Sequence, residues 1–174
     1  MATQITTDST PRDAIGTWNV DPAAGKVGFT VRTMWGLSKV HGSFSRYRGS
    51  LTAQPQGTAG ELVIEAASLD TGHAKRDAHL RSNDFFGVER HPEIAFTTLA
   101  VAPRDDGLNV TGVLRIGDRS LRLELPVDVV REGDRIRLRA AESVSRPRAG
   151  LTWNKLGMIR GDAHLEIDLE LVRG

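Results

Sequence analysis

The sequence predicts an all-β protein of antiparallel strands, and three observations support this fold class. Apolar residues alternate with polar ones over many short segments, which is the pattern of strands that bury one face. Turn sequences rich in Gly, Pro and Asp separate these segments. A single stretch has the composition of a helix. Because alternating strands must bury their apolar faces, the fold is either a sandwich or a closed barrel, and a closed barrel also leaves no exposed strand edge.

Each expected strand has one inward face with a period of two residues. The segment AHLEIDLELV is the clearest, because leucine and isoleucine fill one face and mainly charged residues the other. About eight such segments follow one another, a size at which a barrel interior either fills with side chains or holds one small ligand. Pro126 lies inside the 121–130 segment and predicts a bulge or a sheet edge there, because proline cannot donate to a strand ladder. The inward residues, in chain order, are Val27, Phe29 and Val31; Val40, Gly42 and Phe44; Leu62, Ile64 and Ala66; Ile94, Phe96 and Thr98; Leu108, Val110, Gly112 and Leu114; Leu121, Leu123, Leu125, Val127 and Val129; Ile136 and Leu138; and Leu165, Ile167, Leu169 and Leu171.

The expected helix opens the stretch RDAHLRSNDFFGVERHPEIAF, residues 76–96. Residues 75–82 contain neither Gly nor Pro, and Asp70 or Thr71 is the expected N-cap. Asp77 and Arg81 are four residues apart, so we expect them to form an ion pair on the helix surface. The apolar face is thin, which indicates a helix that lies across other structure rather than one that nucleates a core. Its members are Ala74, Ala78 and Leu80.

The length and composition indicate one folded domain. A chain of 174 residues with 39% apolar content can form one well-buried core, whereas two independent domains would each be marginal. The first residues, MATQITTDSTPRDAI, are polar and rich in Thr and Asp. We therefore expect a flexible N-terminal tail at residues 1–16 and a single barrel domain at residues 17–174.

Charge, cysteine content and hydropathy exclude several classes of function. The formal net charge is +1, with acidic and basic residues interleaved, so no nucleic-acid partner is expected. The absence of cysteine excludes disulfides, thiolate nucleophiles and zinc–thiolate sites. The start of the chain has no secretory signal pattern, and no apolar run approaches the ~18 residues of a membrane span. We expect a cytoplasmic protein, or a mature form whose signal has been removed, without a transmembrane segment.

His79 is the candidate for acid–base chemistry, because histidine is the most common general base in enzymes. Asp77 lies two residues away, and residues two apart on a helix face different directions, so this pair is poorly placed to bond. We therefore favour a structural role for the helix charges. The histidines at positions 41, 73, 79, 91 and 164 lack the spacing that aims two of them at one metal, and no nucleotide-binding or nucleophile motif occurs. Neither a metal nor a cofactor is expected.

Six large apolar side chains are available to fill a barrel: Phe29, Phe44, Phe85, Phe86, Phe96 and Trp153. They could pack the interior solidly. The glycines at the inward positions Gly42 and Gly112 favour the other interpretation, a partly empty lumen, because they leave room. Among the arginines, Arg81 and Arg146 are the candidates for a bidentate contact with an anionic head group.

Four stretches of the sequence resemble the YceI-like family of small lipocalin-like barrels. They are VGFTVRTMWGLSKVHGSFSRYRGSL (27–51), LDTGHAKRDAHLRSNDFFGVERHPEIAFT (69–97), LNVTGVLRIGDRSLRLELPVDVV (108–130) and SRPRAGLTWN (145–154). The resemblance implies an eight-stranded antiparallel lipocalin-like barrel with a short flanking helix, and a long apolar lumen that binds a polyisoprenoid or another long-chain amphiphile. It implies no reaction. It also implies that the helix flanks the barrel mouth and that Phe85 and Phe86 dip into the lumen.

The sequence departs from the family pattern at two places near the expected mouth. The family commonly has a histidine after the VR dipeptide, and here Thr33 follows, with bulky Met34 and Trp35 after it. Where the family usually shows an acid, an aromatic residue and glycine, this chain has Arg148, Ala149 and Gly150. A lost aromatic side chain and an added positive charge would widen the pocket or change the head group it prefers.

The favoured hypothesis is a non-enzymatic protein that binds, transports or sequesters an apolar-chain amphiphile in the lumen. Two alternatives stay open: a hydrolase or isomerase that acts on a lipid-like substrate with His79 as base, and a packed interaction module that forms a homodimer. The expected ligand-binding residues are Phe29, Val31, Phe44, Phe85, Phe86, Phe96, Trp153, His79, Arg81 and Arg146.

Overall fold

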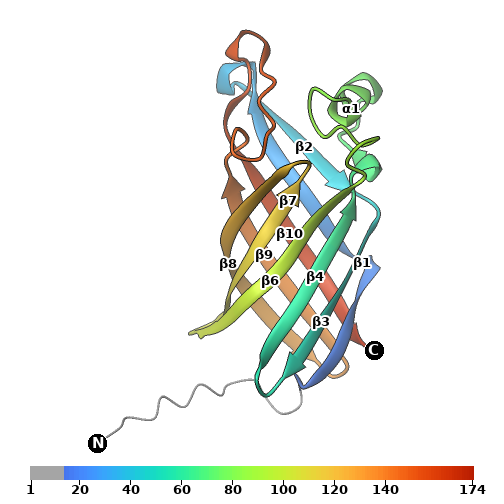
Figure 1. Cartoon of the computed structure of the whole chain (residues 1–174), viewed down its shortest axis with the longest axis vertical. Coiled ribbons are helices and arrows are strands. Elements are labelled where there is room, and N and C mark those ends of the chain that lie inside the picture. The colour runs from blue at the N-terminus through green and yellow to red at the C-terminus, as the bar shows by residue number, and fades with distance from the viewer. Residues whose placement is uncertain (1–13) are drawn as a thin grey trace, which may run out of the picture.

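The structure is a computed structural model that describes residues 14–174, and these form a closed antiparallel β-barrel (Figure 1). Residues 1–13 of the expected tail lie outside the described residues, and Gly16 is the first residue of β1. The strands are β1 (Gly16–Thr33), β2 (Ser38–Phe44), β3 (Tyr47–Gln54), β4 (Gly57–Glu65), β5 (Leu69–Asp70), β6 (Glu93–Arg104), β7 (Gly107–Ile116), β8 (Arg119–Glu132), β9 (Arg135–Val144) and β10 (Arg160–Arg173). One α-helix, α1 (Ala74–Arg81), and three single-turn helices, η2 (Met34–Gly36), η3 (Ala66–Ser68) and η4 (Lys155–Gly157), complete the described chain.

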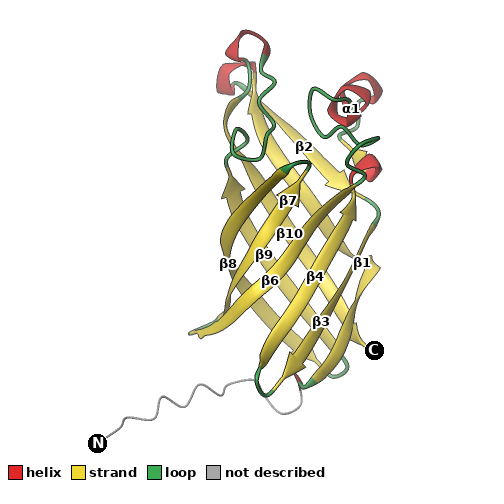
Figure 2. Ribbon diagram, in the orientation of Figure 1, coloured by secondary structure: helices red, strands yellow, loops and turns green. Residues whose placement is uncertain are grey.

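The barrel closes because β10 pairs with β1 as well as with β9. β2 and β3 pair with the second and first halves of β1, so together they occupy one position in the wall, and β5 adds only two residues beside β2. Eight strands therefore surround the axis. This confirms the predicted all-β, eight-stranded antiparallel barrel with a short helix and excludes the sandwich. The helix α1 and the turns η2 and η4 lie at one end of the barrel, which we call the mouth end (Figure 2).

The strand pattern of the sequence is confirmed for the long leucine- and valine-rich segments. Along β8 the buried and exposed positions alternate, with Leu121, Leu125 and Val127 buried. β3 was not predicted, because its inward side carries small residues such as Gly49 and Ala53 that give little apolar alternation. The first half of β1 was also not predicted. The register between β1 and β10 shifts between Asp21 and Lys26, and this irregularity breaks the period of two.

The lumen is partly empty, as predicted, but the prediction that Gly42 and Gly112 provide the free room was wrong. A Cβ on Gly42 would lie 2.3 Å from the Phe29 ring, and a Cβ on Gly112 would lie 2.3 Å from the Phe96 ring. Phe29 and Gly42 are direct cross-strand partners. The glycines therefore make room for two aromatic rings that lie flat against the barrel wall, and the open space of the lumen lies elsewhere.

Pro126 lies at a sheet edge, one of the two predicted alternatives. β8 pairs with β7 in continuous register through Pro126, which excludes a bulge in that ladder. β9 begins to pair with β8 only at Val127, so the mouth-end half of β8 has no partner on that side. The loop after β9 covers this gap, because Ala149 is buried and a Cβ on Gly150 would lie 3.0 Å from the Arg119 side chain at the start of β8.

The helix lies where the sequence predicts it, but its caps and contacts differ. His73 is the N-cap, in place of the predicted Asp70 or Thr71, and its ring accepts a bond from the Arg76 backbone N–H. The expected Asp77–Arg81 ion pair does not form, because each side chain bonds to another segment. Asp77 is the only buried residue of the helix, whereas Ala74 and Ala78 of the predicted apolar face are exposed and Leu80 packs against the core.

Candidate functional site

The lumen contains two cavities that meet at the middle of the barrel. The cavity at the mouth end has a volume of about 340 Å³, and the cavity at the opposite end has a volume of about 730 Å³. Both volumes lie in the range of small-molecule sites, which counts against a solidly packed barrel. Five residues line both cavities and form a ring that we call the waist: Leu62, Phe96, Leu125, Ala140 and Ile167.

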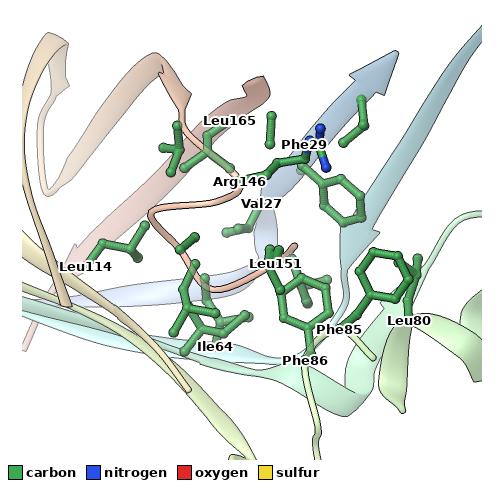
Figure 3. A pocket seen from close by; sticks show the side chains of 18 of the residues that line it. Val27, Phe29, Ile64, Leu80, Phe85, Phe86, Leu114, Arg146, Leu151 and Leu165 are labelled. Atoms are coloured by element: carbon green, nitrogen blue, oxygen red, sulfur yellow. The ribbon is translucent and has the colours of Figure 1, made fainter. Parts of the chain in front are cut away.

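The mouth-end cavity is lined almost wholly by apolar side chains (Figure 3). It brings together nine of the ten side chains that the sequence predicts as ligand contacts. Seven of them are apolar, and they come from β1, β2, β6, the loop after α1 and the loop after β9. The nine are Phe29, Val31, Phe44, Phe85, Phe86, Phe96, Trp153, His79 and Arg146.

Arg81 is the predicted contact that does not line a cavity. Its Nε donates to the carbonyl of Ala67 at 2.9 Å, and its Nη2 donates to the carbonyl of Leu69 at 2.7 Å. These bonds fasten the end of α1 to the segment that leads into it. Arg81 therefore holds the helix in place, and the neighbouring Arg76 lines the mouth-end cavity instead.

Three rings meet at the mouth and connect α1 to the loop after β9. The His79 ring stands edge-on to Trp153, with centroids 4.5 Å apart, and edge-on to Phe85, with centroids 5.2 Å apart. Phe85 and Trp153 are 5.3 Å apart. His79 Nε2 lies 2.8 Å from a carboxylate oxygen of Asp84, so its acidic partner is Asp84 and not Asp77. We call His79, Phe85 and Trp153 the mouth triad.

The start of α1 is fixed by a buried carboxylate. Asp77 accepts bonds from the Thr71 backbone N–H at 3.0 Å and from the Thr71 hydroxyl at 2.5 Å. Arg76 donates to the same Thr71 hydroxyl at 2.7 Å and to the Thr71 carbonyl at 2.8 Å. The sequence predicts Thr71 only as a possible N-cap of the helix, so its bonds to Asp77 and Arg76 were not predicted. Its effect is to hold Arg76 and His79 at the rim of the cavity.

Arg146 is a buried cation in the lining of the mouth-end cavity. Its side chain is 9% exposed, and it donates to the carbonyls of Gly161 and Ile159 at 3.0 and 3.3 Å. Burial lowers the pKa of its guanidinium, and the more distant carboxylate of Asp162 opposes that effect. A buried charge that has only carbonyl partners can be stabilised further by a polar or anionic ligand group.

The cavity at the opposite end is more polar, and the sequence did not single it out. Its lining includes Arg104 and Arg131 together with Pro55 and Gln56, which connect β3 to β4. Arg104 Nη2 pairs with a carboxylate oxygen of Asp128 at 2.5 Å. The indole of Trp18 is fully buried, and the guanidinium of Arg131 lies 5.7 Å from its ring centre. These contacts are long-range, so no local pattern could have predicted them.

The described residues provide neither a cluster of metal ligands nor a membrane-spanning helix. No group of three His, Asp or Glu side chains within residues 14–174 is placed to hold a metal ion. In the same part of the chain, no helix has the length and hydropathy needed to cross a membrane.

Comparisons with known proteins agree with this architecture. A family model described as a YceI-like domain matches residues 18–171. A UPF0312 protein of Photorhabdus laumondii, plu2095, is 37% identical over 110 residues, which cover 62% of this chain and 57% of that protein. The chain thus spans little more than half the length of the curated relatives it matches.

Two solved structures show the same fold. The crystal structure of Burkholderia cenocepacia BcnA aligns with a TM-score of 0.80 and 21% identity, covering 87% of this chain and 98% of that one. A structure described as a polyisoprenoid binding domain from Saccharophagus degradans aligns with a TM-score of 0.73 and 15% identity, covering 90% of this chain and 98% of that one. At these identities the likeness concerns the fold alone.

Proposed function

The chain belongs to the YceI-like family, and on that premise we propose that it binds an apolar-chain amphiphile, a polyisoprenoid or another long-chain lipid, inside the barrel. The protein carries or sequesters this ligand without changing it chemically. The observation that carries the proposal is the apolar mouth-end cavity, which shares the five waist residues with a second cavity beyond it. The description of the Saccharophagus degradans domain as polyisoprenoid binding supports the same ligand class.

The energetics of burial favour a long apolar chain in this lumen. Each methylene group removed from water contributes about 0.8 kcal/mol, so a chain of several isoprene units would bind well without any polar contact. The rings of Phe85, Phe86 and Trp153 supply flat apolar surfaces against which such a chain can lie. The chain enters at the mouth end, and its far end reaches towards the waist.

The polar head of the ligand remains at the mouth. Arg146, Arg76 and Lys155 line the same cavity and provide guanidinium and ammonium donors there. Arg146 in particular is buried, and no carboxylate of residues 14–174 lies within ion-pairing distance of it. A phosphate, carboxylate or hydroxyl head would therefore find donors at the rim while the tail stays in the apolar part of the lumen.

The direct test is mass spectrometry of lipids extracted from protein that was purified without detergent, together with titration of a fluorescent prenyl probe. We expect co-purified lipid and saturable uptake of the probe. Leu123→Gln places a polar group on the inner wall and should weaken uptake at least tenfold, whereas Arg122→Gln, on the outer face of the same strand, should not. Absence of both lipid and probe uptake in the wild-type protein would refute the proposal.

One observation bears on the alternative that the protein is a hydrolase or isomerase. The His79–Asp84 contact resembles the pairing that orients a catalytic histidine. The other ring contacts of His79 in the described chain are with Phe85 and Trp153, which suit a structural role in closing the mouth. An enzyme would show turnover of a lipid ester or prenyl substrate that His79→Ala abolishes, with a pH–rate profile that depends on the histidine. Probe binding that persists in His79→Ala, without turnover in either protein, would support the carrier.

A further inference from the structure

Apolar side chains project into solvent from one side of the barrel mouth. Met34 and Trp35 in η2 are 50% and 52% exposed, Leu37 just after η2 is 87% exposed, and Leu156 in η4 is 77% exposed. The turns η2 and η4 lie side by side beyond the ends of the strands, across the mouth from α1 (Figure 1). We call η2 with Leu37, together with η4, the rim tip. Exposed apolar groups gathered in this way usually mark a binding surface.

The rim tip is built as a defined shape. The backbone N–H of Trp35 donates to the carbonyl of Met158 at 3.0 Å, and its indole N–H donates to the carbonyl of Leu156 at 3.2 Å. Met34, Trp35 and Leu156 have positive φ angles of 49°, 56° and 55°, which are unfavourable for residues other than glycine. Such strain persists where surrounding contacts enforce it and is common at binding surfaces. Here the strained turns hold the apolar side chains outward.

Basic side chains without acidic partners surround the rim tip. Arg32 lies directly beside Lys39 of β2 and Arg160 of β10 in the strand ladder, and Lys155 belongs to η4. None of these four side chains forms an ion pair within the described chain, whereas the arginines of β9 are paired with Asp168 and Glu170. The sequence has no Asp or Glu in residues 22–60 or 143–161, the two segments that supply the rim tip.

The rim tip adjoins the ligand cavity. Thr33, which precedes η2, and Lys155, Met158 and Ile159, in and after η4, all line the mouth-end cavity. The side chains of Met34, Trp35 and Leu156 do not line it. A surface that binds at the rim tip would therefore lie directly against the mouth without occupying the lumen.

We propose that the rim tip docks on the surface of a bilayer that contains anionic phospholipids. Tryptophan is favoured at the membrane interface, large aliphatic side chains such as leucine insert into the acyl-chain boundary, and Lys and Arg without acidic partners are attracted to anionic head groups. A second copy of the chain is the less suitable occupant, because a two-fold interface would place the same cations against each other. Docking itself does not depend on the proposed function, whereas the exchange of a lipid between bilayer and lumen rests on it.

The test is flotation of the full-length protein with vesicles of phosphatidylcholine alone and of equal parts phosphatidylcholine and phosphatidylglycerol. The wild-type protein should float with the anionic vesicles, and salt should weaken the binding. Trp35→Ser with Leu156→Ser should reduce binding at least about tenfold, because two apolar side chains no longer insert. Arg32→Gln with Lys39→Gln should reduce binding to anionic vesicles by about fivefold for each basic residue removed.

The matched control is Leu99→Ser with Val130→Ser, which removes two apolar side chains of similar exposure, 53% and 48%, from the barrel wall. This variant should bind vesicles like the wild type. Uptake of the prenyl probe in solution should be unchanged in the rim-tip variant, so a failure of ligand binding and a failure of docking give different results. Equal flotation of wild-type and rim-tip proteins would overturn the proposal. Conversion of a wild-type dimer to a monomer by the rim-tip changes, without vesicle binding, would also overturn it and assign the surface to a second copy.

Discussion

At the scale of single residues, the absence of a side chain at Gly42 makes room for the ring of Phe29. The three atoms nearest to a Cβ on Gly42 all belong to the Phe29 ring, at 2.3, 2.6 and 2.9 Å. Gly42→Ala should therefore push the ring off its position and destabilise the fold by about 1–3 kcal/mol. Because the obstruction is a single side chain, Phe29→Leu should recover part of this loss. Urea unfolding of the two single variants and of the double variant measures the coupling free energy between positions 29 and 42.

Gly112 provides the contrasting case. A Cβ there meets the Phe96 ring at 2.3 Å but also the backbone carbonyl oxygen of Thr97 at 2.6 Å. Backbone cannot move aside as a side chain can, so Phe96→Leu should rescue Gly112→Ala much less than Phe29→Leu rescues Gly42→Ala. Equal rescue at both sites would show that the wall adjusts more freely than the distances indicate.

Asp168 gives stability a dependence on pH. Arg137 donates to both of its carboxylate oxygens, at 2.7 and 2.9 Å, and this bonding, with the charges of Arg137 and Arg139, holds the pKa of Asp168 below its ordinary value of 3.8. When the pKa of a carboxyl group is lower in the folded than in the unfolded state, its ionised form stabilises the fold. This stabilisation is complete at a pH above the unfolded-state pKa and is lost as the pH falls through the folded-state pKa.

Asp168→Asn should thus lower the free energy of unfolding near pH 7 by up to about 1 kcal/mol, since the pair is partly exposed. The difference from the wild type should stay constant down to about pH 5 and shrink below about pH 4, where the carboxylate of the wild-type protein becomes protonated. Urea unfolding of both proteins at a series of pH values measures this difference in the free energy of unfolding. Glu166→Gln, on an exposed residue without an ion pair in the described chain, is the control and should show no such trend. A difference that grows in acid would contradict the assigned sign.

At the scale of elements, α1 depends on polar contacts because it buries so little apolar surface. Asp77 is its only buried residue and accepts both bonds from Thr71. Asp77→Ala should cost about 1–3 kcal/mol, since the Thr71 N–H loses its partner. Hydrogen exchange should become faster in residues 74–81 while the barrel strands remain protected. Lys75→Ala, an exposed change in the same helix, should leave exchange unchanged; faster exchange throughout the barrel after Asp77→Ala would show that the helix is not a separate unit.

The same elements show what can be predicted from sequence. Strands with Leu, Val or Ile at every second position, such as β8 and β10, were predicted with the correct inward face, and so were most apolar residues of the lumen. β3 was missed because small residues weaken its alternation. The partners of Asp77 and His79, Thr71 and Asp84, are only six and five residues away, but they lie in the loops on either side of α1, and no periodic pattern predicts the path of a loop. Local spacing reveals which face of an element is apolar, whereas polar partners depend on how the loops run.

At the scale of the whole molecule, the waist determines how far a ligand chain can travel. Leu62 and Phe96 of adjacent strands β4 and β6 line it together with Leu125, Ala140 and Ile167. The smallest of these is Ala140 of β9, so side chains fill the waist least beside that strand. The mouth-end cavity alone, at about 340 Å³, limits the length of chain that can be buried, and on the proposed function a longer chain passes the waist into the larger cavity.

Ala140→Phe should close this passage and turn the protein into a binder of short chains. Affinity for a short prenyl alcohol should change little. For a longer chain, each methylene group that is kept out of the far cavity should weaken the binding free energy by about 0.8 kcal/mol, which raises Kd about fourfold. Displacement of a fluorescent prenyl probe by alcohols of increasing length measures this dependence. Ala102→Phe adds the same ring on the outer face of β6 and should preserve the wild-type dependence on length. If Ala140→Phe weakens short and long chains equally, the ligand does not pass the waist, and the far cavity has another role.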